Sequence, residues 1–571
     1  MTSLLAPTNR AGPQRPLDHS SIHRINHFRV RFVKRLILLS CFAILAIAEP
    51  KLSAPAAAWW SHVQFLADAQ QEGRASGSPG HKRAADYIAA QFRAAGLSPL
   101  MPAGYLQPVE FRSRKLLEEQ SRVELLREGQ AARLDFGADL IMAKVGTSAD
   151  VVEAEIVFVG YGLHLPEIGH DDLAGVNLKG KIAFYVSGAP RRVPGALAAH
   201  AQGSERWQSL REAGAVGTLA ESSGTQLTPK WQSLREAGAV GTITFANPRT
   251  SDVPWARAAE MRRLPSLQLT VPELQEGVGN RVSLSLSPAG AEKLLAGSGH
   301  TTAELLARIE ADQALPTFTL PAKLRAKAVF EETLITSENV AGWKRGSDPK
   351  LRGEYVVLSA HLDHLGKGFP GAMDNASGVA SLIEIAKQLK RKKTKRSVIV
   401  LAVTGEENGL LGSKYFANRP PVAKQSLIAD FNMDMFLPLV PLKAIMALGL
   451  DESDLGDRFR AVASAQGIPV VADREPLRRR FTRSDQYSFI RNGVPSLAFK
   501  FDAAPGTPED QIMKDWTRDR YHGMKDDLTQ PVDQEAAVKF IGILQSAIED
   551  TANQADRPRW KDSSFFKRFA Q

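Results

Sequence analysis

Three apolar runs in the second half of the chain each lead directly into a histidine or an acidic residue, and this pattern constrains the fold most. VVLSA precedes His361, VIVLAVTG precedes the pair Glu406 and Glu407, and LIADFNM precedes Asp434. Continuous apolar runs are typical of strands that are covered on both faces of a sheet. In an open α/β sheet, the carboxyl ends of such strands meet at a crevice where ligands bind. The sequence therefore predicts an α/β fold with a mixed, mostly parallel sheet, helices on both faces, and a site at one sheet edge.

Helical patterns surround these runs. GVASLIEIAKQLKR (378–391) places Val379, Leu382 and Ile383 on one face, as expected for a helix packed on the sheet. Two more helices are predicted within 59–97, separated by the glycine-rich turn GRASGSPG (73–80). We expect these early helices to complete the same domain as the later strands, so that the domain is split along the chain.

Short β-rich runs punctuated by glycine and proline dominate the stretch between these parts, namely 154–162, 179–186, 238–246 and 281–287. No cluster of metal-ligating residues occurs in them, and the α/β pattern begins at Phe318. A chain of 571 residues requires more than one core. The expected organisation is a signal peptide (1–48), the first part of a catalytic domain (49–130), a β-rich insert (131–315), the second part of the catalytic domain (316–555) and a tail (556–571).

One segment occurs twice. WQSLREAGAVGT stands at 207–218 and again, without a change, at 231–242. Repeat architectures diverge and run to several copies, so two identical copies indicate a recent local duplication or an error in the source sequence. We expect one copy to form a helix and strand of the insert and the other to form a surface excursion.

The formal charge of +10 is concentrated at the N-terminus. Residues 1–48 hold seven of the 72 basic residues and one of the 62 acidic ones, which leaves +4 for the rest of the chain. The basic clusters at 390–393 and 478–480 contain no interleaved aromatic residues and are typical of solvated loops. Nucleic acid is therefore not an expected partner.

The N-terminal segment resembles a secretory signal. FRVRFVKR (28–35) is basic, and the apolar run that follows (36–48) is too short for a membrane span. We expect an exported protein, periplasmic or extracellular, with no stable membrane span once the signal is cleaved; a lipoprotein signal at Cys41 and an uncleaved anchor are the alternatives. Cys41 is the one cysteine of the chain, so the mature protein must bind metal through histidine and carboxylate side chains.

Five positions have the residue types of a two-zinc site, in which imidazole nitrogens and carboxylate oxygens bind two ions about 3.5–4 Å apart. A carboxylate can bridge such ions through its two oxygens, and an additional carboxylate that binds no metal can act as the base; Glu406 is available for that role. A lone histidine or aspartate is usually structural, whereas the joint pattern favours a metal site. The five positions are His361, Asp374, Glu407, Asp434 and His522.

Six ordered blocks resemble the secreted two-zinc aminopeptidase family, whose relatives include glutamate carboxypeptidase and the non-catalytic transferrin receptor. The blocks are AHLDHLG, GAMDNASG, TGEENGLLGS, NMDM, RSDQYSFIRNGVPSL and YHGMKDD. The resemblance covers nearly all of the mature chain. It implies a zinc exopeptidase fold of the phosphorylase/hydrolase-like type, two Zn2+ per chain, and a protease-associated (PA) domain as the β-rich insert.

The resemblance also implies roles for individual residues. His361 and Asp434 bind one zinc, Glu407 and His522 bind the other, and Asp374 bridges them. Glu406 is then the general base, Asp363 orients His361, and the Asp374–Asn375 peptide bond is cis. His364 fits no ligand role and is expected to be structural.

Peptides are the expected substrates, and hydrolysis of the N-terminal residue is the expected reaction. Tyr521 and Tyr487 are candidates for the substrate pocket, although a role as core aromatics is equally compatible with the pattern. Arg483 and the run 478–480 could bind a substrate carboxylate, which keeps a carboxypeptidase of the glutamate-releasing type as the alternative. A non-catalytic receptor-like protein and a single-zinc cyclase of glutaminyl termini are further alternatives, and the sequence leaves the oligomeric state open.

Overall fold

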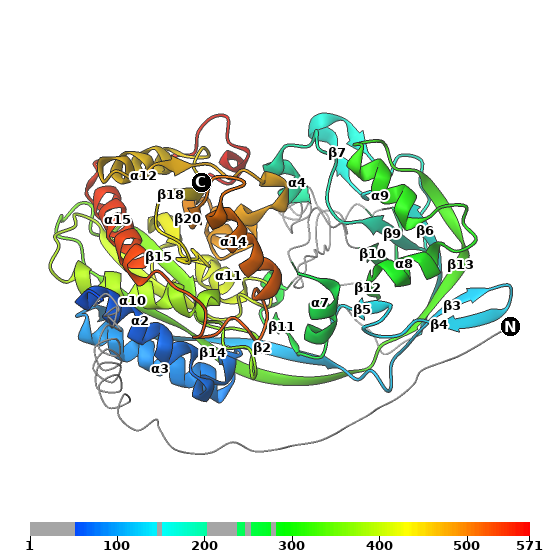
Figure 1. Cartoon of the computed structure of the whole chain (residues 1–571), viewed down its shortest axis with the longest axis horizontal. Helices are drawn as coiled ribbons and strands as arrows, with labels where there is room; N and C mark the ends of the chain where they lie inside the picture. The colour runs from blue at the N-terminus through cyan, green and yellow to red at the C-terminus, as the bar shows by residue number, and fades with distance from the viewer. Residues whose placement is uncertain are drawn as a thin grey trace, which may run out of the picture. The chain divides into compact units, whose positions relative to one another are not determined.

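The computed structural model describes residues 52–144, 151–201, 234, 237–245, 253–275 and 281–570 (Figure 1). The predicted signal peptide and the first copy of the repeated segment lie outside these residues, and the second copy lies only partly within them. Among the helices that are described, none has the length and apolar character needed to cross a membrane.

The larger of the two main sheets contains ten strands in the order β11-β2-β14-β16-β15-β17-β20-β18-β19, with β1 paired to β14. β15 is parallel to both β16 and β17, and β17 is parallel to β20, whereas β14 and β2 add antiparallel strands on one side. β18 is antiparallel to β20 on the other side. The predicted mixed, mostly parallel sheet is thus a mixed α/β sheet whose centre is parallel and whose two sides include antiparallel pairs. Its strands are β1 (Ser98–Pro99), β2 (Leu106–Leu116), β11 (Ser266–Leu269), β14 (Phe330–Lys344), β15 (Tyr355–His361), β16 (Ser397–Val403), β17 (Leu427–Asn432), β18 (Ala444–Leu448), β19 (Val470–Val471) and β20 (Ser496–Asp502).

Alternate residues of the central strands enter different cores, because side chains alternate between the faces of a sheet. Leu358 of β15 belongs to the core that contains helices α2, α3, α10, α12 and α15, whereas its neighbour Val357 packs with α11 and α13. The predicted cover of helices on both faces is therefore confirmed. The helices are α2 (Ala54–Ala67), α3 (Pro79–Ala94), α10 (Ser377–Leu389), α11 (Leu411–Asn418), α12 (Asp454–Ala465), α13 (Gln486–Ile490) and α15 (Gln534–Asn553).

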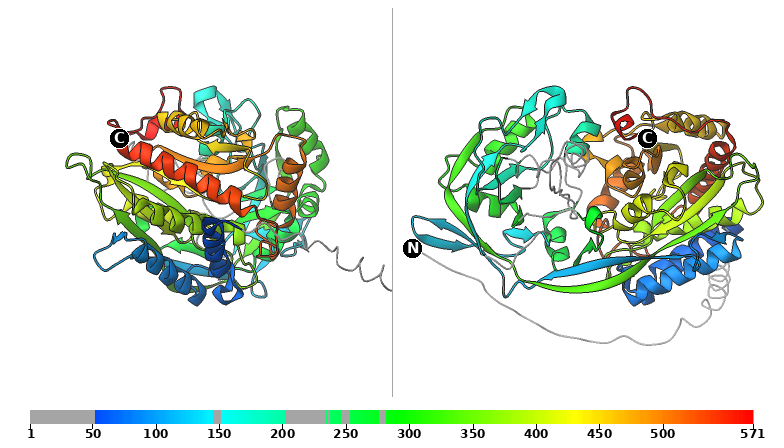
Figure 2. Two further views of the ribbon diagram at one scale, coloured as in Figure 1. Left: turned by 60° about the vertical axis from the view of Figure 1, so that its left-hand side comes forward. Right: turned by 180° about the vertical axis from the view of Figure 1, so that it is seen from behind.

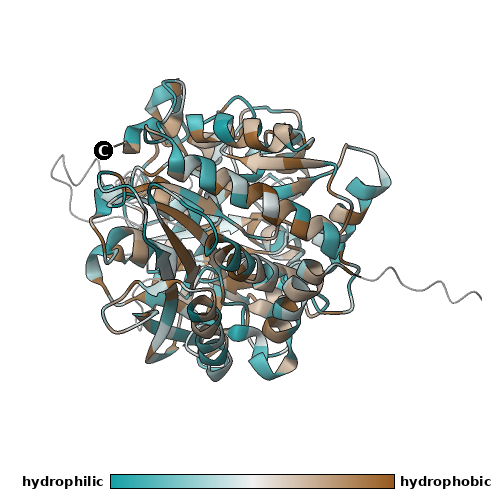
Figure 3. Ribbon diagram, turned by 90° about the vertical axis from the view of Figure 1, so that its left-hand side faces the viewer, coloured by the Kyte–Doolittle hydropathy of each residue, from teal (hydrophilic) through white to brown (hydrophobic). Residues whose placement is uncertain are grey.

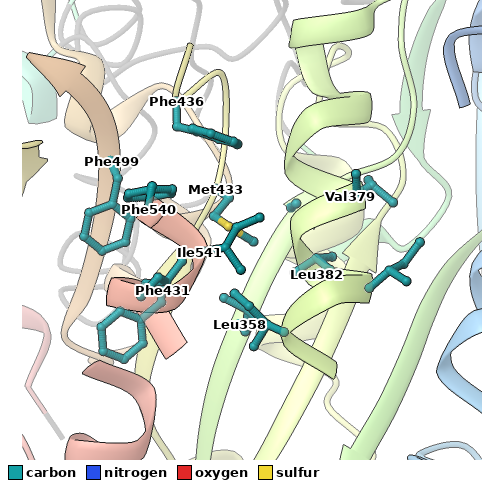
Figure 4. Close-up of a cluster of buried hydrophobic side chains, with 14 of the residues drawn as sticks. Leu358, Val379, Leu382, Phe431, Met433, Phe436, Phe499, Phe540 and Ile541 are labelled. Carbon is teal, nitrogen blue, oxygen red and sulfur yellow. The ribbon is translucent and has the colours of Figure 1, made fainter. Parts of the chain in front are cut away.

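The core on the first of these faces is dense in large side chains. Figure 4 shows Leu358 and Phe431 of the sheet with Leu382 of α10 and Phe540 of α15, all fully buried. Figure 3 shows brown, apolar strands between helices that carry teal residues. Burial of such side chains contributes roughly 1.5–3 kcal/mol each, and this packing makes the strand ends rigid supports for the residues that follow them.

A second sheet has eight strands in the order β4-β3-β13-β6-β9-β10-β12-β5 and its own apolar core. Its strands are β3 (Arg122–Arg127), β4 (Gln130–Arg133), β5 (Leu140–Met142), β6 (Val152–Val159), β9 (Ile182–Val186), β10 (Gly241–Phe245), β12 (Ser283–Leu286) and β13 (Thr317–Lys327). The four β-rich runs predicted within the insert correspond to β6, β9, β10 and β12. The remaining elements are the pair β7 (His164–Leu165) and β8 (His170–Asp171), with α4 (Gly195–Ala201), α7 (Trp255–Met261), α8 (Pro288–Leu295), α9 (Thr302–Glu310) and α14 (Pro508–Asp519).

Sheet membership differs from the predicted boundaries at three places. β3 and β4 lie before or across residue 131, and β13 lies after residue 315, yet all three pair within the second sheet. Conversely, β11 lies inside the range predicted for the insert but pairs with β2 of the larger sheet. The composition changes gradually along these strands, and only the hydrogen-bond partners define the sheet to which each belongs.

Two long strands connect the sheets. β2 and β14 pair antiparallel along their length, with Leu106 opposite Val340 at one end and Leu116 opposite Phe330 at the other. In the chain, β2 is followed by β3 of the second sheet, and β14 is preceded by β13 of the second sheet. The same two strands are seen from behind in Figure 2. Apart from β11, the chain therefore leaves and rejoins the larger sheet through one paired ribbon.

Candidate metal centre

The five predicted ligand positions come together at the carboxyl edge of the parallel strands. His361 is the last residue of β15, Glu407 lies just beyond the end of β16, and Asp434 lies just beyond the end of β17. Asp374 lies in the turn 372–376 that leads into α10, and His522 follows α14. Because β15, β16 and β17 are parallel neighbours, their ends deliver these side chains to one place, as the sequence pattern predicts.

Asp374 lies between two groups of donors. Its Oδ1 atom is 3.3 Å from His361 Nε2, which in turn is 3.3 Å from Asp434 Oδ1. Its Oδ2 atom is 3.3 Å from His522 Nε2, which in turn is 3.2 Å from Glu407 Oε2. One carboxylate therefore contacts two imidazoles through different oxygens, and each imidazole has a second carboxylate partner.

These separations fit zinc. Zinc binds imidazole nitrogen and carboxylate oxygen at about 2.0–2.2 Å in a tetrahedron, so neighbouring ligand atoms lie about 3.3 Å apart. Each of the four separations agrees with that spacing. In addition, Asp374 Oδ2 is buried without a hydrogen bond, and His361, Asp374 and Glu407 each offer a ligand atom within 4.8 Å of the others. The donor set and its geometry therefore accommodate two ions.

The sequence of this region matches a known family. Residues 339–547 match Peptidase family M28. This part of the chain, called the M28 segment below, is therefore similar to that family. The resemblance to two-zinc aminopeptidases that the motif blocks indicate is thereby confirmed.

Several curated proteins are similar over part of their length. A protein named probable leucine aminopeptidase 2 from Aspergillus fumigatus is 33% identical over 172 residues, which is 28% of this chain and 32% of that protein. Aminopeptidase Y from Saccharomyces cerevisiae is 28% identical over 208 residues, which is 35% of this chain and 36% of that protein. The chain thus spans about a third of the length of these relatives.

The fold is shared with a solved structure. The aminopeptidase from Aneurinibacillus sp. strain AM-1 superposes with a TM-score of 0.51 at 20% identity, covering 88% of this chain and 95% of that chain. At that identity the likeness shows the fold alone. The M28 segment of this chain contains all five predicted ligand positions together with Glu406.

Acidic and imidazole side chains of the candidate site shift one another's pKa values strongly. Burial alone would raise the pKa of Glu407, but the imidazoles of His522 and His364 outweigh it and hold the pKa at about 2. Burial likewise opposes protonation of His522, yet Glu407 and Asp374 raise its pKa to about 10. The two carboxylates and the imidazole therefore stabilise one another's charged forms.

Glu406 contacts none of the ligand atoms at hydrogen-bond distance, which separates it from its neighbour Glu407. Burial raises the pKa of Glu406 well above its usual value, and the negative charges of Asp434 and Asp485 raise it further against the effect of His361. The adjacent pair therefore divides as the sequence predicts, with one carboxylate among the ligand atoms and one beside them.

Asp363 differs in detail from its predicted role. The Nδ1 atom of His361 lies 3.1 Å from the backbone carbonyl oxygen of Asp363, whereas the side-chain Oδ1 is 4.0 Å away. That Oδ1 accepts a hydrogen bond of 3.2 Å from the backbone N–H of Glu406. Asp363 thus orients His361 through its main chain and supports Glu406 through its side chain.

His364 and the Asp374–Asn375 bond agree with expectation. His364 Nδ1 lies 2.6 Å from Glu407 Oε1, the oxygen that does not face His522, so it supports a ligand rather than acting as one. The Asp374–Asn375 peptide bond is cis, as the family resemblance implies.

Asp526 is a functional residue that the sequence analysis missed. Its carboxylate is fully buried and accepts hydrogen bonds of 2.9 Å from the backbone N–H groups of Met373 and Asp374. Gln530 donates to it at 2.6 Å and accepts in turn from the indole of Trp516. The chain of contacts fixes the backbone of Asp374. Asp526 lies within the block YHGMKDD, but its buried acceptor role depends on contacts that no spacing reveals.

Arg74 and Asp485 were also missed. The Arg74 guanidinium is 1% exposed and donates to the backbone carbonyls of Leu362 and Gly371, which flank the first ligands. Burial raises the pKa of Asp485 to about 7, with Asp363 and Asp434 adding to the effect. Arg74 lies in the glycine-rich turn and Asp485 in the block RSDQYSF. The sequence shows an arginine and an aspartate at these positions, but it does not show which groups they contact in the folded chain.

The two tyrosines predicted for the substrate pocket have different surroundings. The Tyr521 ring lies 4.0 Å from the His522 ring, centroid to centroid, and its pKa is raised well above normal by burial first and by Asp374 and Glu407 next. Tyr487 is 3% exposed and belongs to an apolar cluster with Ile490. Tyr521 thus lies beside the site and Tyr487 lies in an apolar cluster, and a role of either residue in the substrate pocket stays a prediction.

Proposed function

We propose that the chain is a zinc-dependent metallo-aminopeptidase that hydrolyses N-terminal residues from peptides. The observation that carries this proposal is the placement of Asp374 between two histidine–carboxylate pairs at zinc-compatible separations of 3.2–3.3 Å. The M28 match and the names of the aminopeptidase relatives support it.

Two zinc ions would be held by residues already described. His361 and Asp434 would hold one, Glu407 and His522 the other, and Asp374 would contribute one oxygen to each. When bound, zinc supplies Lewis acidity toward a water molecule and a substrate carbonyl oxygen. The chain itself supplies a rigid frame, because the ligands stand on strand ends and buried turns.

Glu406 is proposed as the general base and acid. It lies beside the ligand carboxylates without contacting them, so its oxygens are available to a water molecule and a substrate. Its carboxylate would accept a proton from the attacking water and deliver it to the nitrogen of the leaving amine, which breaks the peptide bond without net consumption of protons by the residue.

Charge around the site favours an aminopeptidase over a carboxypeptidase. The carboxylates of Asp434 and Asp485 act on Glu406, and such groups suit the positive α-amine of a substrate. Two of the arginines that could bind a substrate carboxylate are engaged within their own loop, since Arg478 pairs with Glu475 at 2.9 Å and Arg480 pairs with the same residue at 2.6 Å. Arg483, whose charge acts on Tyr521, keeps the carboxypeptidase as the alternative that the substrate panel must separate.

A substrate panel tests the assignment. Zinc-loaded protein is incubated with aminoacyl anilides that have a free N-terminus and with N-blocked dipeptides that have a free C-terminus. We expect release only from the first group. Cleavage confined to the second group would establish a carboxypeptidase, and no cleavage by a fully zinc-loaded protein would contradict the proposal.

Export and domain organisation are also proposed. Residues 1–48 would be removed as a signal peptide, and the second sheet would be a PA domain; the arrangement of its strands into a separate core supports this. Mass determination of the protein recovered from an exporting host tests the first point. A mass that includes residues 1–48 would contradict cleavage, and the same measurement shows whether both copies of WQSLREAGAVGT are present.

A further inference from the structure

The two proposed zinc positions are supported by different parts of the fold. His361 and Asp434 follow central strands, and the backbone N–H of Met433 donates to the carbonyl of Ser359 across them at 2.9 Å. Glu407 and His522 lie in loops beyond the sheet, and His522 has a φ of 52°. A non-glycine residue in that left-handed region is strained by about 1 kcal/mol or more, so its surroundings must hold it in place.

Residues 254–269, which comprise α7 and β11 and are called the brace segment below, contact both loops. Arg257 of α7 donates to the backbone carbonyl of Tyr521, the residue before His522, and at 2.7 Å to the carbonyl of Arg518. The backbone N–H of Leu267 in β11 donates at 2.9 Å to Oδ1 of Asn408, the residue after Glu407. One short segment therefore holds the neighbours of both ligands of one zinc position.

The brace segment is itself anchored. β11 pairs antiparallel with β2 at the edge of the larger sheet. Trp255 donates at 2.8 Å to the carbonyl of Gly137, and Arg262 forms an ion pair of 2.9 Å with Glu118. Lys144 donates to the carbonyl of Leu264. Because hydrogen bonds and an ion pair hold the segment at both ends and along its length, it can fix the separation between the loops that carry Glu407 and His522.

We propose that Arg257 is a positioning residue that sets the affinity of the Glu407–His522 zinc position through the brace segment, while the His361–Asp434 position is independent of it. This inference rests on the proposed two-zinc function. It follows that the two ions bind with separable affinities, and that loss of Arg257 weakens one of them.

The test is a zinc titration of the full chain. Metal-free protein is titrated with zinc against a chromophoric chelator, and two dissociation constants are obtained for the wild type and for Arg257→Ala. Loss of a group that orients a metal ligand typically costs 10–100-fold in affinity. We expect one dissociation constant to rise about tenfold, at the low end of that range, and the other to be unchanged. Asn408→Ala should affect the same constant.

Controls separate positioning from general destabilisation. Arg263→Ala removes an exposed arginine from the same segment and should change neither constant. Hydrogen exchange of metal-free Arg257→Ala should increase at residues 518–523 and stay unchanged at 431–434. If the alanine variant does not fold, Arg257→Lys replaces it, with a rise in the same constant that is smaller because one donor remains.

The contrary outcomes are distinct. Two unchanged constants, or two constants raised by the same factor, would overturn the role of Arg257. A wild-type chain that binds a single zinc would instead contradict the two-zinc proposal, and the wild-type titration alone reveals it before any variant is compared.

Discussion

At the scale of single residues, Asp374 is the side chain on which both proposed zinc positions depend. Each of its oxygens faces a different imidazole, and Asp526 holds its backbone N–H. Among the described residues, no other carboxylate lies within ion-pair distance of both His361 and His522. A change at Asp374 should therefore affect the two positions together, unlike a change at Glu407 or Asp434.

Replacing Asp374 with alanine should lower the zinc content of the protein below two ions per chain. The substitution removes one oxygen ligand from each position, and three-ligand sites lose affinity when a charged ligand is removed. Elemental analysis after dialysis measures the effect, with Asp457→Asn, an exposed carboxylate on α12, as the control. Retention of two zinc ions in Asp374→Ala would contradict the bridging role.

Replacing Glu406 with glutamine should leave both zinc ions in place and lower kcat by about 100- to 10,000-fold, the usual contribution of a general base. The amide keeps the size of the side chain but cannot accept the proton. Steady-state kinetics with an aminoacyl anilide, alongside zinc analysis of the same sample, measures both quantities. Wild-type turnover in this variant would remove the proton-transfer assignment.

At the scale of elements, Arg74 ties together segments that are distant in sequence. Its guanidinium donates to the carbonyls of Leu66 in α2, Leu362 after β15, and Pro370 and Gly371 before the turn that carries Asp374. Burial lowers its pKa to about 10 while nearby carboxylates such as Asp526 oppose the change, so the group stays charged at neutral pH and balances the acidic site.

Replacing Arg74 with methionine should lower the free energy of unfolding by about 3 kcal/mol or more, because each buried carbonyl left without a donor costs about 1–3 kcal/mol. Methionine keeps the length of the stem and isolates the loss of the guanidinium. Urea denaturation of the metal-free protein measures the change. Arg83→Met, at an exposed position on α3, should lower the free energy of unfolding by less than about 0.5 kcal/mol. Equal losses of stability in both variants would contradict a structural role for the Arg74 hydrogen bonds.

The sequence predicts some elements far better than others. β15, β16 and β20 are evident because both of their faces are buried, which requires continuous apolar runs. β2 alternates buried and exposed residues and carries arginines, so neither its length nor its place in the larger sheet is apparent. β11 has four residues, too few for a pattern, although the brace segment depends on it.

The residues of the candidate site likewise fall into those that the sequence predicts and those that it does not. His361, Glu407 and Asp434 are predictable because strand ends in a parallel sheet converge. Asp526, Arg74 and Arg257 act through backbone groups of other segments, and a hydrogen bond to a distant carbonyl or N–H leaves no periodicity in the sequence. Residues that bind can therefore be found from motifs, whereas residues that position them require the folded chain.

At the scale of the whole molecule, stability should depend on pH through Lys144. Burial lowers the pKa of this lysine from 10.5 to about 8. Between these values the unfolded chain binds more protons than the folded one, so the free energy of unfolding rises with pH, by about 2 kcal/mol from pH 7 to 9.5 for this group alone.

Urea denaturation of the wild type and of Lys144→Met at both pH values measures this contribution. The free energy of unfolding of the wild type should rise relative to that of the variant only as the pH passes 8, because below that value the lysine is protonated in both the folded and the unfolded chain. A difference between the two proteins that is constant across the pH range would show that Lys144 titrates normally.

The paired strands β2 and β14 have a consequence for how such genes can change. Because Leu116 and Phe330 are partners in one register, a short hairpin turn could join them and leave the strands of the larger sheet other than β11 in place. Everything between them can thus be gained, lost or exchanged by recombination at one locus. Such an exchange would also remove Arg257, so a shortened descendant would need a new support for the loop that carries His522.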